Sequence, residues 1–158
     1  MQILAAGGAY IYTSTNVMAN ATLMCAGPYK IPNIRIDSQA VYTNNIPAGA
    51  FRGFGGPQGA FAAECQINKL AEKLNIEPVE LRRMNALHVG SITNTGQELR
   101  ESVGLKECIE RVDAEMRKKN PQPFKPVVDP AKPNLFRAGG FAADYKNTGL
   151  GGGASDKS

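Results

Sequence analysis

A glycine-rich stretch directly ahead of a helical pattern constrains this chain more than any other feature. Residues 48–61, AGAFRGFGGPQGAF, set one arginine and three phenylalanines among five glycines. Glycine adopts positive φ at little cost and lets backbone N–H groups come close to another group. Apolar residues at helical spacing follow over 57–75. We therefore expect a tight loop at the N-terminal end of a helix, where an anionic or oxo-bearing ligand is well placed.

Two side chains of this stretch are candidates for contact with a ligand. Phe54 lies between glycines, so its ring could face a flat ligand, and Arg52 could supply charge or anchor the loop. A glycine-rich turn before a helix also forms simply to pack tightly. From the residues alone, both the ligand site and the packing turn stay open.

The rest of the chain alternates strand and helix signals. Strand-like residues occupy 3–13 and 29–44, and a helix between them would be capped by Ser14 or Thr15 and stopped by Gly27-Pro28. A short helix is predicted near Pro78, and Leu105, Cys108, Ile109, Val112 and Met116 form a helical stripe expected in the core. This mixture predicts an α+β fold.

Five prolines between residues 120 and 134 interrupt the pattern. They exclude a regular helix and favour an extended connection between two structural units. The strand-like residues resume at 136 and lead into a run of glycines. We place the division of the chain at residues 1–100 and 101–158.

Composition narrows the classes of function. With 42% hydrophobic and 20% charged residues, the chain can bury a core, and its formal charge of +4 is spread among acids rather than gathered in a basic run, so nucleic acid is not indicated. Cys25, Cys65 and Cys108 are too widely spaced for a metal clip or a disulfide frame, which favours a reducing, cytoplasmic setting. The sequence shows neither a signal peptide nor an apolar run of membrane-spanning length.

The run AFRGFGGPQG at 50–59 resembles the molybdenum-binding subunit of the xanthine dehydrogenase and aldehyde oxidase family of molybdenum hydroxylases. GPYKIPNIRI at 27–36 and INKLAEKLNIEPVELRRMNAL at 67–87 extend the similarity, and ADYKNTGLGGG at 143–153 resembles the stretch that enters a second molybdopterin-binding domain. The resemblance implies that 1–100 is the C-terminal part of a first molybdopterin-binding domain and that 101–158 begins a second.

The resemblance also implies site residues. Phe51, Arg52 and Gly53 match cofactor-binding positions, with the Arg52 backbone next to the molybdenum, and Phe54 matches a phenylalanine that packs on the substrate ring. Asn20 falls where purine-hydroxylating members carry an arginine, which speaks against a purine substrate.

The similarity is incomplete at one further position. A second stacking aromatic, expected near Leu150 or Gly151 after Lys146, is missing. The FRGFGG form also departs from carbon monoxide dehydrogenases, which carry a cysteine in this loop.

The chemistry implied by the resemblance is hydroxylation of an aromatic heterocycle or an aldehyde with oxygen from water. The cofactor is molybdenum-molybdopterin, with the cytosine dinucleotide form as one option, and a glutamate acts as base. Electrons leave through 2Fe-2S clusters and usually FAD, so the partners are the remaining molybdopterin-binding chain or domain, an iron-sulfur subunit and an FAD subunit. A membrane is not among them.

Other residues carry simpler interpretations. His88 has no ligand partners at suitable spacing and is expected to be solvated, and Cys65 is expected to be a small buried hydrophobe. Glu64 and Glu72 are expected to be surface charges, Glu107 with Arg111 suits an exposed i,i+4 pair, and Phe141 suits strand core.

The sequence contains neither a GQG-type pterin loop nor the family's catalytic glutamate, so no catalytic residue is assigned, and the chain is interpreted as an internal piece of a hydroxylase that is inactive alone. The first alternative is a non-catalytic remnant of the fold. The second is a phosphate- or nucleotide-binding module using the glycine loop, against which stands the lack of Lys-Ser or Lys-Thr after the glycines.

Overall fold

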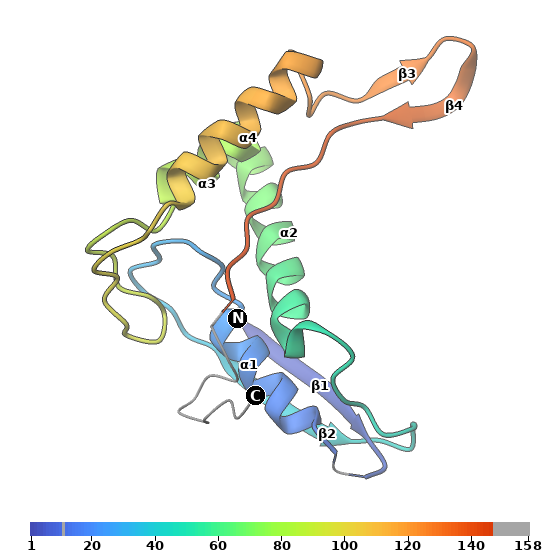
Figure 1. Ribbon diagram of the computed structural model, residues 1–158. Coiled ribbons are helices and arrows are strands. Elements are labelled where there is room, and N and C mark those ends of the chain that lie inside the picture. The colour runs from blue at the N-terminus through green and yellow to red at the C-terminus, as the bar shows by residue number, and fades with distance from the viewer. Residues whose placement is uncertain (11, 147–158) are drawn as a thin grey trace.

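The structure is a computed structural model, and it describes residues 1–10 and 12–146. It is an α+β arrangement, as predicted from the sequence (Figure 1). Its elements are β1 (Gln2–Gly8), α1 (Ser14–Met24), β2 (Asp37–Tyr42), the short 3-10 turn η1 (Gly53–Gly55), α2 (Gly56–Leu74), α3 (Pro78–Asn85), α4 (Leu105–Lys119), β3 (Val127–Asp129) and β4 (Lys132–Arg137).

Strands β1 and β2 pair in parallel, with Gln2 opposite Asp37, and α1 forms the crossover between them. Both strands are shorter than predicted. β1 ends at Gly8, whose φ of +83° turns the chain away from the sheet, and residues 31–36 before β2 form no strand. A parallel pair needs a long connection, and the helix predicted between the strands supplies it.

Helix α1 is capped differently from the prediction. It begins at Ser14, so Thr13 occupies the N-cap position instead of Ser14 or Thr15, and Thr13 makes no side-chain capping bond. The Thr13 hydroxyl accepts a hydrogen bond from the Ala50 N–H at 3.1 Å instead. The residue at the helix start is therefore used to hold the glycine-rich stretch.

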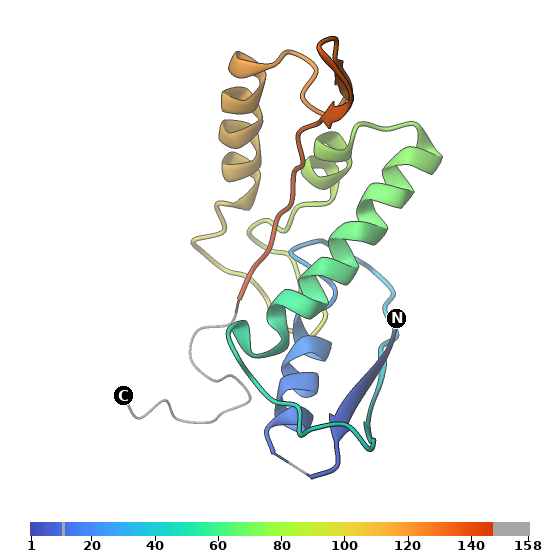
Figure 2. The same ribbon diagram turned by 90° about the vertical axis from the view of Figure 1, so that its right-hand side faces the viewer.

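Helix α2 begins and ends where the sequence predicts. Pro57 lies in its first turn, and Asn75 terminates it in the left-handed conformation with a φ of +53°. The helix packs closely on α1, because a Cβ at Gly59 would lie 2.9 Å from the Ala21 carbonyl oxygen. Figures 1 and 2 show α2 running from the sheet end of the molecule to the end that holds α3 and α4.

The apolar stripe of α4 is mostly outside the core, contrary to the prediction. Ile109 is 2% exposed and packs with Val79 and Ala86, whereas Val112 is 49% exposed. Phe141 is half-buried against the same cluster, although it lies outside any strand. Helical spacing correctly placed Ile109 on the buried face, but Cys108 and Val112 of the same stripe are exposed.

The proline-rich segment contains no helix, as predicted, yet it is more than an extended connection. It folds into the antiparallel hairpin β3–β4, with Val128 opposite Phe136, and the hairpin projects away from the sheet end (Figure 2). Residues 138–146 then run back beside α2 without regular structure (Figure 1). The glycine run with Leu150 and Gly151 lies outside the described residues.

Candidate functional site

The predicted loop has an unusual backbone. Arg52 is extended, and the next three residues, Gly53, Phe54 and Gly55, all have positive φ, at +73°, +49° and +91°. The left-handed conformation costs a residue with a side chain roughly 1–2 kcal/mol. Phe54 must therefore be held in place by contacts with the rest of the molecule.

Helix α1 supplies those contacts. The Asn20 amide donates a hydrogen bond from Nδ2 to the Phe54 carbonyl at 2.8 Å. A Cβ at Gly55 would overlap the Val17 carbonyl oxygen and lie 3.0 Å from the Ala21 nitrogen, so the loop backbone lies directly on α1. Glycine is required here both for its φ and for this approach.

The loop presents polar groups outward. Phe51 is 95% exposed, Arg52 is exposed and Phe54 is half-buried. Within the described residues, the backbone N–H groups of Phe51 and Arg52 donate to no acceptor and the Arg52 guanidinium has no ion-pair partner. Amide donors and a cation thus lie at the N-terminal end of a 19-residue helix, an arrangement suited to anionic oxygens.

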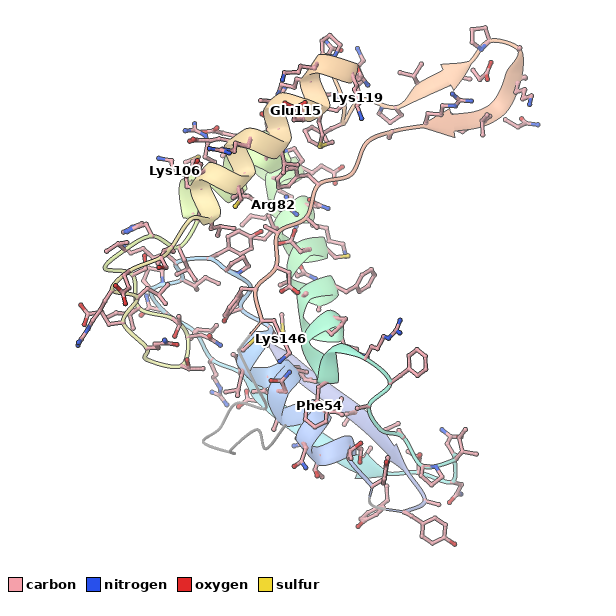
Figure 3. The ribbon with its side chains drawn as sticks, in the orientation of Figure 1. Phe54, Arg82, Lys106, Glu115, Lys119 and Lys146 are labelled. Atoms are coloured by element: carbon pink, nitrogen blue, oxygen red, sulfur yellow. The ribbon has the colours of Figure 1, made fainter. Side chains whose placement is uncertain are left out.

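Lys146 reaches the same end of α2. A Cβ at Gly56 would lie 3.4 Å from the Lys146 Cδ, so this side chain crosses the first turn of the helix. Figure 3 shows Lys146 and Phe54 near the start of α2. The structure therefore brings the segment that ends at Lys146 next to the glycine-rich loop, although the two lie far apart in the sequence.

A cavity of about 910 Å³ lies between residues 93–105 and the segment that carries Lys146. The Tyr145 hydroxyl lies 3.2 Å from the Asn94 Oδ1 there. Burial raises the pKa of Tyr145, and it also raises the pKa of Asp144 above its ordinary value.

Glu64 is buried, which corrects its prediction as a surface charge. Its Oε1 accepts the Tyr29 hydroxyl at 2.5 Å, and its Oε2 accepts Arg82 Nε at 2.8 Å and the Ala143 N–H at 2.9 Å. Arg82, which is labelled in Figure 3, is 0% exposed and also donates to Asn68 Oδ1 at 2.9 Å. Both carboxylate oxygens are therefore paired.

This network joins four parts of the chain: α2, α3, the turn after α1 and the segment that ends at Lys146. Burial, reinforced by the hydrogen bond to the carboxylate, raises the pKa of Tyr29 well above its ordinary value. The network fixes the segment that reaches the loop, and the sequence offered no local sign of it, because its partners lie up to 79 residues apart.

The remaining candidates behave more simply. His88 is exposed and Glu72 is exposed, as predicted, whereas Cys65 is only half-buried. The Glu107–Arg111 pair forms at 2.5 Å on the surface. In residues 1–10 and 12–146, no group of three or more His, Cys, Asp or Glu side chains comes together as a metal site, and no helix is long and apolar enough to span a membrane.

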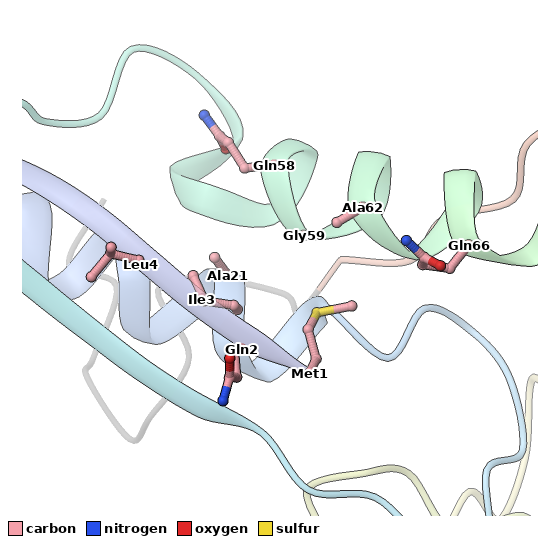
Figure 4. Close-up of a pocket in the computed structure, with 9 residues that line it drawn as sticks. All are labelled: Met1, Gln2, Ile3, Leu4, Ala21, Gln58, Gly59, Ala62 and Gln66. Carbon is pink, nitrogen blue, oxygen red and sulfur yellow. The ribbon is translucent and has the colours of Figure 1, made fainter.

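A second hollow is lined by β1 and the first half of α2. Figure 4 shows a cavity of about 630 Å³ between β1 and α2, where Gln2, Gln58 and Gln66 provide neutral amides among apolar side chains. It holds none of the predicted site residues and no acidic or basic side chain. The loop, and not this cavity, is therefore the candidate site.

The sequence matches the family described as "Molybdopterin cofactor-binding domain" over residues 1–86. The chain belongs to this family. It is 48% identical over 104 residues to the nicotinate dehydrogenase large molybdopterin subunit of Eubacterium barkeri, covering 66% of this chain and 24% of that subunit. It is 51% identical over 70 residues to the aldehyde oxidoreductase of Megalodesulfovibrio gigas, covering 44% of this chain and 8% of the relative.

The fold agrees with these matches. A solved structure of the aldehyde oxidoreductase from Desulfovibrio gigas superposes with a TM-score of 0.65 at 34% identity, over 78% of this chain and 14% of that one. The resemblance to the xanthine dehydrogenase and aldehyde oxidase family is thereby confirmed. This chain spans about a quarter or less of the length of these relatives.

Proposed function

We propose that this chain supplies the cofactor-facing loop of a molybdenum hydroxylase that oxidises an aromatic heterocycle or an aldehyde with oxygen from water. The observation that carries the proposal is the loop at residues 51–55, with its successive positive φ values, its N–H groups without an acceptor in the described part of the chain and its attachment to α1. Membership of the molybdopterin cofactor-binding family supports it and speaks against an unrelated phosphate-binding module.

The loop residues fit an anionic, oxo-bearing cofactor. The residues Phe51 and Arg52 are exposed, and their N–H groups donate to no acceptor among the described residues, so both are available as donors. When bound, molybdenum-molybdopterin supplies the two-electron oxidation of the substrate carbon. In our proposal the Phe51–Gly53 backbone orients that group, Phe54 packs on the substrate ring and excludes water beside it, and the base comes from outside this chain.

Exposed apolar side chains around the loop support a partner surface. Tyr10, Tyr12, Ile46 and Phe61 are 73%, 68%, 87% and 74% exposed, which is costly for residues of this size. We propose that the remaining molybdopterin-binding domain covers them, that residue 100 marks the end of the first domain, and that the chain is inactive alone. We also propose that iron-sulfur and FAD subunits are partners of this chain in the cytoplasm and that the cofactor has the cytosine dinucleotide form.

The first experiment is metal analysis of the chain purified from its native source without denaturant, together with mass spectrometry of the co-purifying proteins. We expect near-stoichiometric molybdenum, iron and larger partner chains. A lone chain without either metal would instead identify a non-catalytic remnant of the fold.

A matched pair of variants tests the loop itself. Gly53→Ala places a Cβ 2.5 Å from the Pro57 Cδ at a φ of +73°, whereas Gly96→Ala has a φ of +84° with no described atom within 4 Å. Both variants carry the backbone penalty, but only the first disturbs the loop. We expect the molybdenum-to-protein ratio of the purified complex to fall for Gly53→Ala and to stay unchanged for Gly96→Ala; equal ratios would refute the loop assignment.

A further inference from the structure

Asn20 is the most unusual polar residue of α1. It is 4% exposed, and its Nδ2 donates to the Phe54 carbonyl at 2.8 Å. Its Oδ1 is buried and has no hydrogen-bond partner among the described residues. The orientation of the amide is unambiguous, since a carbonyl oxygen only accepts and the NH2 group must therefore face Phe54.

The unpaired oxygen argues against a purely structural role. A buried acceptor without a partner costs about 1–3 kcal/mol, whereas an apolar residue in the same place would carry no such cost. One hydrogen bond contributes about 0.5–1.5 kcal/mol net, so the Asn20 amide adds little or nothing to the free energy of unfolding. Its contribution must lie in the conformation of the residue it bonds.

Phe54 is held in an unfavourable backbone conformation. Phe54 has a φ of +49° and a ψ of +44°, at a cost of roughly 1–2 kcal/mol, which is the size of the hydrogen bond that Asn20 provides. Because the direction of the Cα–Cβ bond follows from the backbone, the same bond that holds the Phe54 carbonyl also sets where its ring points.

We propose that Asn20 is a positioning residue that holds Phe54 in the left-handed conformation and thereby fixes the direction of its ring. This rests on the proposed role of Phe54 against the substrate. Gly55 fixes the following peptide on α1 by close contact, and Asn20 fixes the Phe54 carbonyl, so the ring is held from its own residue and from the next one. Asn20 thus determines how precisely a flat substrate is positioned.

The test is hydrogen exchange by mass spectrometry on the full chain, comparing the wild type, Asn20→Ala and the control Thr22→Val. Thr22 is a half-buried residue of the same helix, and its hydroxyl forms hydrogen bonds with the Met18 carbonyl and the Ser38 hydroxyl instead of the loop. Loss of one hydrogen bond predicts about two- to tenfold faster exchange of the amides at 53–56 in Asn20→Ala. Thr22→Val should leave these amides unchanged, and equal exchange in Asn20→Ala and the wild type would overturn the proposal.

A second measurement distinguishes greater mobility of the ring at position 54 from general loosening of the fold. The chain has no tryptophan, so Phe54→Trp places a single fluorescent reporter at the ring position. In that background, we expect Asn20→Ala to lower the fluorescence anisotropy while the urea midpoint stays close to that of Phe54→Trp alone. A falling midpoint with unchanged anisotropy would assign Asn20 a structural role only. Neither measurement uses the cofactor, so their failure is distinct from a failure of the metal analysis.

Discussion

Replacing Gly55 by alanine measures how firmly the loop is held against α1. Gly55 has a φ of +91°, and a Cβ there would overlap the Val17 carbonyl oxygen and lie 3.0 Å from the Ala21 nitrogen. Both contacts are with helix backbone, which cannot rotate aside as a side chain can. The variant can fold only if the loop moves away from α1 or the helix itself is displaced.

The magnitude has two parts. The left-handed backbone costs a residue with a Cβ roughly 1–2 kcal/mol, and forcing an extra methyl into a packed region costs typically 1–3 kcal/mol. Gly55→Ala should therefore lower the free energy of unfolding by about 2–5 kcal/mol. Gly96→Ala has only the backbone cost, because its φ is +84° and no described atom lies within 4 Å of the new Cβ.

The assay is urea unfolding of the full chain followed by circular dichroism at 222 nm. With a urea dependence of about 1–3 kcal/mol per molar, the steric part should lower the midpoint of Gly55→Ala by on the order of 1 M more than that of Gly96→Ala. Equal shifts for the two variants would refute the reasoning, because the backbone penalty alone would then explain both.

Three other changes follow from the buried network and the cysteines. Arg82→Ala leaves the buried Glu64 carboxylate without its counter-charge and should cost about 3–5 kcal/mol in urea unfolding, whereas Arg83→Ala removes only a partly exposed salt bridge with Glu80 and should cost less than about 1 kcal/mol. The raised pKa of Tyr29 means that the folded state keeps its proton, so stability falls as the pH rises above 10; Tyr29→Phe should flatten that fall, and unchanged slopes of stability against pH would contradict it. Burial raises the pKa of Cys25, so an alkylating reagent followed by mass spectrometry should modify exposed Cys108 first, and early labelling of Cys25 would count against its burial.

Local signals in the sequence predicted several features correctly. Pro57 and Asn75 mark the ends of α2, and Pro78 begins α3. These signals are local, because proline restricts its own φ and asparagine tolerates the left-handed conformation, and both effects act within one or two residues. The glycines around Phe54 likewise predicted a tight loop before a helix, and the decapeptide that contains them carried the resemblance to the family that the comparisons confirm.

Features that depend on distant partners could not be predicted in the same way. The proline-rich segment folds back as a hairpin because β3 and β4 pair with each other. Proline content alone excludes a regular helix, but it does not predict which residues pair. The stripe on α4 has the spacing of a buried face, but Val112 remains exposed, because burial also requires another element to pack over the side chain.

The amino-acid sequence by itself determined the loop, the helix that follows it and the family, because these depend on residue types close together in the chain. Only the tertiary structure decided that Glu64 is buried with Arg82 and that Asn20 holds Phe54. The physical reason is that the residues next to a polar side chain in the sequence do not reveal whether it forms hydrogen bonds with water or with a partner far along the chain. Its environment is settled when separate helices pack and bring that partner within hydrogen-bond distance.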